Sequence, residues 1–354
     1  MHLRRICCLL LLVALVLAAK TFIYAEAPLP ETADAYHFKF WQGSPYNAAY
    51  TEWWYFNLYD AKDDLQAIFT YQVIDPLNLT GFGASQIVAL VYQGNKIVAD
   101  AGFYPLALFT ASYSAANVSV GANTISVAGP NTYVIAGSSL DGRLSWNLYY
   151  DRDAASWFAA DRSNVAPLPW EQMSWLLYMP RAHVSGTLTV DGHGYKIDAP
   201  GYHDHNWGEW NFATVSWNWA QYSQPGLSFD LGDFVGNPNG KASINVGGKR
   251  VVFAANQYKL VHAKWAFDQG NNLSYPIESV FTAENESQGV KVRVEMNVQK
   301  TEPLRSGPPP SLVIYEQPCR FSGRITLQDQ WRPVEIPFEG NGFKEYTATT
   351  YPAP

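Results

Sequence analysis

The residue types best suited to chemistry are concentrated between Gly201 and Trp210, where two of the seven histidines stand two positions apart. If this stretch is an extended strand, side chains two positions apart lie on the same face. One predicted face carries His203, His205, Trp207 and Glu209, and the other carries Tyr202, Asp204, Asn206 and Trp210. Two imidazoles, an indole and a carboxyl group on one face indicate a reaction site. The alternative is a hydrogen-bonded tie between strands.

Glu52 is a second candidate, because it stands directly before the aromatic run Trp53-Trp54-Tyr55-Phe56. A carboxyl group held among aromatic rings is desolvated, which raises its pKa and can keep it protonated at neutral pH. Glu52 is therefore a candidate acid. The alternatives are a surface glutamate on an edge strand, or one paired with an arginine such as Arg181.

The spacing of His203, His205 and Glu209 overlaps the first metal motif of cupin barrels, in which histidines and a carboxylate share a metal ion. The glycine expected ahead of this pair is missing, and only His262 remains downstream for a second motif. We therefore expect no bound metal. No Gly-x-Ser-x-Gly elbow occurs, and Cys319 has no acidic or histidine neighbour, so we expect no covalent hydrolase.

Two tryptophans, Trp217 and Trp219, lie two positions apart, as on one face of a strand. They either pack in a core or line a cavity. Aromatic residues make up 15% of the chain, enough to fill sheet cores or to surround an apolar ligand. The net charge of −7 and the lack of any Lys/Arg run argue against nucleic acid as a partner.

The N-terminus reads as a signal peptide over residues 1–25, with a basic start, an apolar run from Ile6 to Ala19 and small residues for cleavage. The apolar run is short for a membrane span, so we expect a secreted chain with no stable membrane anchor after cleavage. Cleavage would leave Cys319 alone, without an internal disulfide. Four sequons fit a secretory route and predict surface loops at Asn78, Asn117, Asn272 and Asn285.

The elements that must position these residues are strands. Apolar residues alternate with polar ones from Leu65 to Val73, which is typical of a half-buried antiparallel strand. Glycine-containing turn signals recur between such runs, and no helical period is sustained beyond the N-terminus, apart from a possible short helix at 169–174. The Pro-rich stretch 301–310 predicts a long hairpin loop. The fold class is therefore all-β, with sheets closed or packed face to face.

Three segments carry a family resemblance: Thr51 to Phe56, the Trp175-x4-Pro180 segment ahead of Gly186-x-Leu188, and above all Gly201 to Gly208. They resemble the carotenoid hydratase (hydroxyneurosporene synthase) and AttH-like superfamily, with kievitone hydratase and the fungal lipocalin-like Diels-Alderases as relatives. The resemblance covers about Trp41 to Lys344. It implies two packed lipocalin-like antiparallel β-barrel domains, 28–212 and 213–354, with a ligand cavity between them and no cofactor. We expect a monomer.

The resemblance also implies roles for particular residues. The hydratases look to use the positions of His205 and Trp207, with a Tyr and an Asp further on, for which Tyr222, Asp230 and Asp233 are the candidates. The Diels-Alderases look to use the positions of Glu52, Trp207 and a late lysine, here Lys344. We place the remaining substrate contacts at His203, Asp204, Trp54, Trp217 and Trp219.

Two mechanisms fit these residues. In a hydratase, Glu52 or Asp230 protonates an alkene, aromatic faces such as Trp207 and Tyr222 stabilise the carbocation, and His205 activates water to capture it. In a Diels-Alderase or cyclase, the pocket folds a polyene and donors such as Trp207 or Lys344 polarise it. The expected substrate is a hydrophobic alkene-bearing metabolite, such as a prenylated phenol or a polyene. A third reading is a carrier that releases a hydrophobic ligand unchanged.

Overall fold

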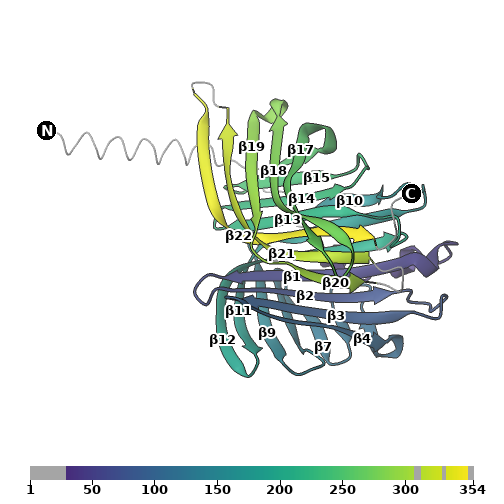
Figure 1. Ribbon diagram of the computed structural model, residues 1–354. Helices are drawn as coiled ribbons and strands as arrows, with labels where there is room; N and C mark the ends of the chain where they lie inside the picture. Colours follow the sequence, from purple (N-terminus) through teal and green to yellow (C-terminus); the bar gives the residue numbers. More distant parts are fainter. Residues whose placement is uncertain (1–28, 307–311, 329–331, 350–354) are drawn as a thin grey trace.

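The computed structural model describes residues 29–306, 312–328 and 332–349 (Figure 1). The expected signal peptide lies outside these residues. Within them every long element is a strand, and the helices are 3-10 turns of three or four residues. No helix in this part of the chain is long and apolar enough to cross a membrane.

The first half of the chain forms sheet A, twelve antiparallel strands between residues 50 and 209. Its path runs β4-β3-β2-β1-β12-β11-β9-β8-β7-β6-β5, with β10 on the side of β11. The β4 end of this path approaches the strands near its other end, because the side-chain amide of Asn123 on β7 donates to the hydroxyl of Tyr104 on β4, so the sheet nearly closes into a barrel. The strands are β1 (Tyr50–Asp60), β2 (Leu65–Ile74), β3 (Ala84–Gln93), β4 (Lys96–Pro105), β5 (Phe109–Ala111), β6 (Val118–Val120), β7 (Asn123–Gly129), β8 (Thr132–Ser138), β9 (Leu144–Arg152), β10 (Trp157–Asn164), β11 (Gln172–Val190) and β12 (His193–Glu209).

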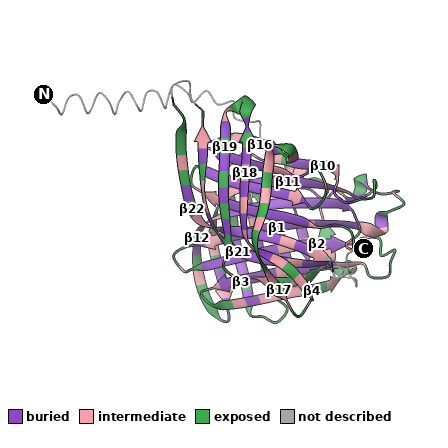
Figure 2. Ribbon diagram, turned by 45° about the horizontal axis from the view of Figure 1, so that its top comes forward, coloured by how far each residue is buried: buried purple, intermediate pink, exposed green. Residues whose placement is uncertain are grey.

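The second half forms sheet B, ten antiparallel strands that begin at Trp217. Its path runs β16-β15-β14-β13-β22-β21-β19-β18-β17, with β20 on the side of β21. Residues of β19 alternate strictly between buried and exposed, as Figure 2 shows, because one face of the strand meets solvent. The strands are β13 (Trp217–Gln224), β14 (Leu227–Phe234), β15 (Lys241–Val246), β16 (Lys249–Ala254), β17 (Tyr258–Asp268), β18 (Leu273–Asn285), β19 (Val290–Val298), β20 (Glu302–Ser306), β21 (Leu312–Leu327) and β22 (Val334–Thr349).

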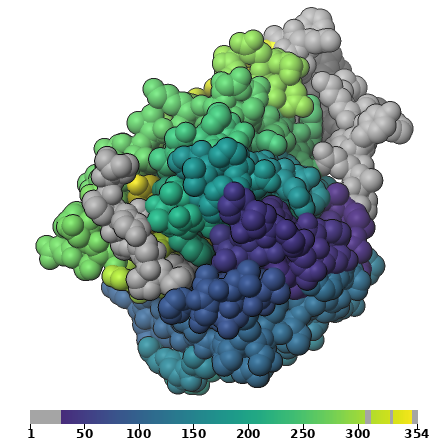
Figure 3. Space-filling view, turned by 90° about the vertical axis from the view of Figure 1, so that its right-hand side faces the viewer, coloured from purple at the N-terminus to yellow at the C-terminus, as the bar shows by residue number. Residues whose placement is uncertain are grey.

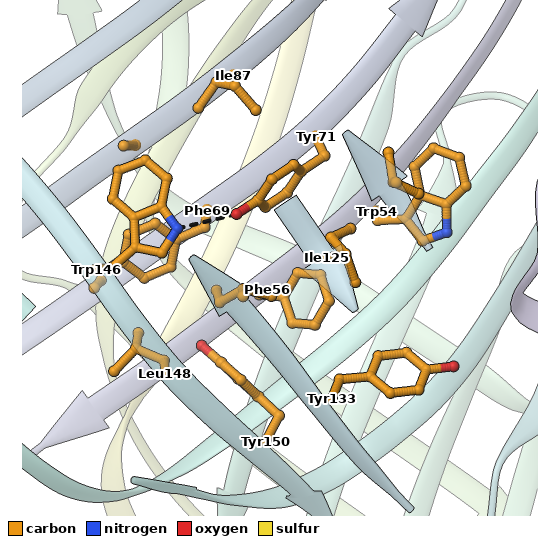
Figure 4. Close-up of a cluster of buried hydrophobic side chains, with 14 of the residues drawn as sticks. Trp54, Phe56, Phe69, Tyr71, Ile87, Ile125, Tyr133, Trp146, Leu148 and Tyr150 are labelled. Carbon is orange, nitrogen blue, oxygen red and sulfur yellow. Dashed lines mark hydrogen bonds between the residues drawn. The ribbon is translucent and has the colours of Figure 1, made fainter. Parts of the chain in front are cut away.

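Buried apolar side chains form three layers. One fills the inner side of sheet A and includes Phe56, Phe69 and Trp146, with the indole N–H of Trp146 donating to Tyr71 (Figure 4). A second lies between the two sheets, and a third fills the inner side of sheet B. The sheets face each other through β1, β12, β13 and β21, which meet at the middle of the molecule in Figure 1. The lipocalin-like all-β architecture expected from the sequence is therefore confirmed.

Residues 31–49, which we call the plug segment, run along sheet A before β1 begins. They contain three 3-10 turns, Glu31–Asp34, Phe38–Phe40 and Asn47–Ala49. Tyr36, Phe38 and Trp41 insert into the inner layer of sheet A. Figure 3 shows this purple segment at the surface beside the blue and teal strands.

Three local expectations are wrong. The segment 169–174 is a turn that leads into β11, not a short helix. Part of the expected loop at 301–310 is the edge strand β20, where Pro303 lies opposite Tyr315; residues 307–310 lie outside the described part. An edge strand tolerates proline because its outer side forms no backbone hydrogen bonds with another strand, so the missing N–H of proline costs nothing there. Of the four sequon asparagines, three are exposed, but Asn285 is 8% exposed and donates to the backbone of Val252.

Candidate active site

The pleat of β12 divides the candidate residues between two faces. Its register with β1 places Glu52 opposite Trp207 and Trp54 opposite His205. These residues point into the inner layer of sheet A, whereas Tyr202 and Asp204 point toward sheet B. The two faces predicted from the sequence alternation are confirmed, and they lead to two different environments.

On the inner face, a buried chain of carboxyl and imidazole groups joins the plug segment to the strands. Asp34 contacts both histidines: its Oδ2 lies 2.9 Å from His203 Nε2, and its Oδ1 lies 3.0 Å from His205 Nδ1. His205 Nε2 lies 2.8 Å from Glu52 Oε1. The side chains of Asp34, His203, His205 and Glu52 are fully buried.

Hydrogen bonding fixes the protons of this chain. Both ring nitrogens of His205 face carboxylate oxygens, so each contact needs a proton. His203 donates from Nδ1 to the carbonyl of Tyr55 and faces Asp34 with its other nitrogen, which needs a further proton. An imidazolium ring at His205, between two carboxylates, satisfies both of its contacts.

The pKa shifts of Glu52 and His205 agree with this assignment. Burial alone would raise the pKa of Glu52, but hydrogen bonds with His205 and His37 outweigh it and hold the pKa below its ordinary value. Burial alone would lower the pKa of His205, yet its bonds to Asp34 and Glu52 raise it. Glu52 is therefore an ionised carboxylate, and the expectation that it is a protonated acid is wrong, because its partners are histidines rather than rings alone.

His37 of the plug segment completes the inner face. Its ring stacks on Trp207 with centroids 3.7 Å apart, and its backbone N–H donates to both oxygens of Glu52. The hydroxyl of Tyr50 donates to the same carboxylate. Trp54 stacks on His205 and donates from its indole to the carbonyl of Asp34. The arrangement ties the plug segment to β1 and β12.

The same side chains include a possible metal-ligand set. His37, Glu52 and His205 each offer one ligand atom, all within 4.8 Å of one another. Two of these contacts are hydrogen bonds, 2.8 Å for His205 with Glu52 and 3.3 Å for His37 with Glu52. A metal ion would therefore have to displace the protons that hold the set together.

Two adjoining pockets of about 30 and 50 Å³ lie between the sheets, and Asp204 and Asn206 on the outer face of β12 line the first of them. Both are lined by Trp53, Tyr55, Trp217 and Glu345. Volumes of this size hold a few water molecules. Aromatic rings dominate the first pocket, which is lined by Trp53, Tyr55, Trp175, Trp217, Trp219 and Phe234.

Asp204 is the carboxyl group of the first pocket. It accepts hydrogen bonds from the indole of Trp175 at 2.8 Å, from the hydroxyl of Tyr202 at 2.9 Å and from Asn206 at 3.1 Å. Burial outweighs these bonds and raises the pKa of Asp204 to about 6. The desolvated acid expected among aromatic rings is thus found at Asp204 rather than at Glu52.

Three more buried carboxyl groups lie on the sheet B side. Burial raises the pKa of Asp230 well above its ordinary value, and Ser243 donates to it at 3.1 Å. Glu316 and Glu345 both line the second pocket, and burial raises both pKa values. The charge of Glu345 raises the pKa of Glu316 further, and that of Asp204 raises the pKa of Glu345. Asp230, the alternative acid predicted from the sequence, is not among the residues that line either pocket.

The remaining sequence candidates divide by face. Trp217 and Trp219 line the first pocket. Tyr222 packs in the inner layer of sheet B, where its hydroxyl donates to Gln224, so it does not reach the pockets. Lys344 also turns away from them, donates to Gln317 at 3.1 Å and has a pKa lowered by burial to about 8. Asp233 accepts from Tyr258.

Several residues of both faces escaped the sequence analysis. Asp34 and His37 belong to an irregular Pro-punctuated segment far from β12 in sequence, and only the fold brings them to the histidines. Glu316 and Glu345 lie in strands whose partners could not be read from the sequence. An acidic residue within an apolar strand was the available signal for both glutamates.

Two antiparallel sheets packed over an aromatic, carboxyl-bearing pocket define the class: a lipocalin-like two-sheet protein. No family model matches the sequence, and no curated protein matches it. Solved structures with the same fold include a protein assigned as AttH from Nitrosomonas europaea, 13% identical with a TM-score of 0.68, where the match covers 92% of this chain and 98% of that one.

Two further structures share the fold. Kievitone hydratase from Nectria haematococca is 15% identical with a TM-score of 0.59, over 91% of this chain and 96% of that one. CghA, solved with Sch210972, is 12% identical with a TM-score of 0.57, over 85% of this chain and 88% of that one. At these identities the similarity establishes the fold, which agrees with the superfamily that the sequence motifs resemble.

Proposed function

We propose that this protein is a cofactor-independent enzyme that adds water to an alkene of a hydrophobic metabolite, with its reaction centre between the two sheets. One observation carries the proposal: Asp204, with a pKa raised to about 6, lies in a pocket walled by aromatic rings. A carboxyl group whose pKa is raised toward neutral pH is partly protonated there and can give its proton to an alkene. The surrounding indole and phenol faces stabilise the resulting cation.

The chemistry needs no group beyond these side chains. The acid O–H bond breaks, the alkene π electrons form a C–H bond, and a carbocation remains on the neighbouring carbon. Water adds to this carbon and returns a proton to the carboxylate, which restores the acid. The expected substrate is a prenylated phenol or a polyene, and kievitone hydratase, which shares the fold, is a hydratase by name.

Cyclisation is the second candidate. The spaces of about 30 and 50 Å³ hold only a few water molecules, so a substrate of either reaction would enter only when the side chains that line them move apart. An internal nucleophile or diene would then close a ring in place of hydration, with the gain coming mainly from orientation.

Mass spectrometry separates these outcomes. The purified protein is incubated with a panel of prenylated phenols and linear polyenes in light and heavy water. Hydration gives a product heavier by one water with deuterium on carbon, and a pericyclic ring closure gives an isomer without it. If the protein binds these compounds and every compound is recovered unchanged, the protein is a carrier and not an enzyme.

Trp219→Leu tests the pocket assignment. Removing an indole face beside a desolvated cation costs about 2 kcal/mol, which corresponds to a rate about 30-fold lower. His183→Gln is the matched control, because His183 is exposed and pairs with Asp198 on the outside of sheet A. Equal rates in both variants would show that the reaction does not take place in this pocket.

We also propose that the chain is secreted, on the strength of the N-terminal segment and the exposed sequons Asn78, Asn117 and Asn272. Expression in a eukaryotic secretory host should give a mature N-terminus near residue 26 and a mass that falls on glycosidase treatment. An intact N-terminus on the cell-associated protein would contradict the proposal.

A further inference from the structure

Glu316 and Glu345 face each other across the sheet B edge of the pocket. The antiparallel register of β21 and β22 pairs them directly, and both side chains line the second pocket. Their exposed fractions are 4% and 9%. Glu345 also lines the first pocket, so it stands where the two pockets adjoin.

Their hydrogen bonding is incomplete without a shared proton. The indole of Trp217 donates to Glu345 Oε2 at 3.1 Å. No N–H or O–H of the described residues reaches the buried Oε2 of Glu316. The two side chains project from directly opposite positions of paired strands, which places their Cβ atoms about 5 Å apart on one face of the sheet. Two adjacent buried carboxyl groups cannot both ionise at neutral pH.

We propose that Glu316 and Glu345 form a proton-sharing pair that gives the alkene its proton in place of Asp204. This assignment rests on the proposed function and changes only which carboxyl group of the pocket is the acid. The pair gives its proton to the alkene carbon and gains one negative charge beside the cation formed. After water adds, the pair takes the proton back. Asp204, in the same pocket, adds negative charge that stabilises the cation once it ionises.

The groups around the pair explain why it stays protonated. Asp204 of β12 is a further carboxyl group near both glutamates, and the buried phenol of Tyr55 on β1 faces them. Tyr92 of β3 lies near Glu316, and Glu302 of β20 is its partner across the sheet. Among the described residues, the cations near the pair include Lys344, on the opposite face of β22, and Arg305 of β20, which lines the second pocket and donates to Asn271. Burial and neighbouring acids raise the pKa values of the pair in spite of these positive charges.

Infrared titration of the protonated carboxyl band tests the pair directly, whatever the substrate. Wild type should lose protons from the pair in two steps, and Glu316→Gln or Glu345→Gln should leave a single step from the remaining glutamate. Glu335→Gln, an exposed residue of the same strand that pairs with Arg324, is the matched control and should leave the titration unchanged. If Glu316 and Glu345 of the wild type each titrate in one independent step near the ordinary carboxyl pKa, the two groups do not share a proton and the proposal is wrong.

Turnover of the alkene that wild type converts best tests the role of the pair. Each glutamine variant should lose about 100-fold or more in rate while circular dichroism shows a folded protein, and Glu345→Asp should recover part of it. The wild-type rate should fall as pH rises through the upper pKa of the pair. The pH–rate profile of a glutamine variant should lack this fall. A folded Glu345→Gln with the wild-type rate overturns the assignment and leaves the hydratase proposal standing. If wild type converts no alkene, the proposed function fails, while the titration still decides whether the proton is shared.

Discussion

At the scale of residues, His205 lies between two carboxylates that the fold has removed from water. Its two nitrogens contact Asp34 and Glu52, and all three side chains are fully buried. Burial has removed the hydration of both carboxylates, so each depends on the positive charge of the histidine for its stability. The main role of this histidine is therefore to hold the plug segment to β12.

His205→Gln should accordingly lower the free energy of unfolding by about 3–5 kcal/mol at pH 7, because it leaves a net negative charge in the inner layer of sheet A. Denaturant titration followed by fluorescence measures the change. The double variant Asp34→Asn/His205→Gln, which removes one of the two carboxylates, should recover part of the loss. A fully stable His205→Gln that had lost turnover would instead favour a catalytic role for His205.

At the scale of elements, the register of β12 depends on a glycine. Gly208 has a φ of +155°, and a Cβ there would stand 2.1 Å from the carbonyl oxygen of Gln172 on β11. Any side chain would therefore push the two strands apart at the end that carries Trp207. Gly194, on the same strand, has open space around its Cβ position.

Gly208→Ala should therefore destabilise the fold by about 1–3 kcal/mol, whereas Gly194→Ala should change stability little. Thermal unfolding of the two variants provides the comparison. Equal melting temperatures would show that the strands accommodate the methyl group, contrary to the close approach in the structure.

The segment that joins β12 to β13 lies beside the pockets, because its residue Phe212 lines two of them. Phe212 lines the second pocket and also an outer pocket of about 230 Å³ that contains Trp170, Trp210 and Phe82. Its ring therefore separates the inner space from the outer one. Movement of Phe212 would therefore connect the second pocket with the outer pocket.

Phe212→Ala should join the two pockets and speed the binding of a hydrophobic fluorescent probe by about tenfold, without changing the infrared titration of the carboxyl groups. Stopped-flow fluorescence measures the association rate. Leu77→Ala, at an exposed apolar residue that lines neither pocket, is the control. An unchanged rate in Phe212→Ala would place the route elsewhere.

At the scale of the whole molecule, the interface between the sheets binds protons that the unfolded chain releases. The pKa values of Asp230 and Glu316 are raised well above those of the unfolded chain by burial, and the pKa of His205 is raised by its carboxylate partners. A group whose folded pKa is raised contributes stability that is present below the unfolded pKa and lost as pH rises through the folded pKa.

Stability should therefore fall as pH rises from about 6.5 to 8, by about 1.4 kcal/mol per pH unit for each proton that only the folded state holds. In this window His262 and His37, whose pKa values are lowered by burial, are already neutral in the folded state. Lys344, with a pKa of about 8, loses its charge only toward the upper end of the window. Urea unfolding at several pH values measures the slope.

Asp230→Asn should make the fall in unfolding free energy with pH less steep by about 1.4 kcal/mol per pH unit, the contribution of one proton, because the amide does not titrate. The exposed pair of Lys264 and Glu278 provides a control, since Glu278→Gln should leave the slope unchanged. A stability that stays constant or increases over the window would contradict the protonation of the interface carboxyl groups.

The amino-acid pattern alone determined the strand class and the two faces of β12. Period-two alternation needs no partner strand to be read, because successive side chains of any extended chain point to opposite sides. The aromatic content and the motif at 201–208 likewise indicated an apolar pocket with an acid among rings. The two-sheet fold that these features predicted is the fold observed.

Only the tertiary structure decided which face meets the pocket and which carboxyl groups have raised pKa values. Asp34 reaches His203 and His205 from more than a hundred residues away, and hydrogen bonds with His205 and His37 hold the pKa of Glu52 below its ordinary value. Glu316 and Glu345 become neighbours only through the register of β21 and β22. A pKa depends on burial and on the charges within a few ångströms, and both are set by contacts between residues distant in sequence.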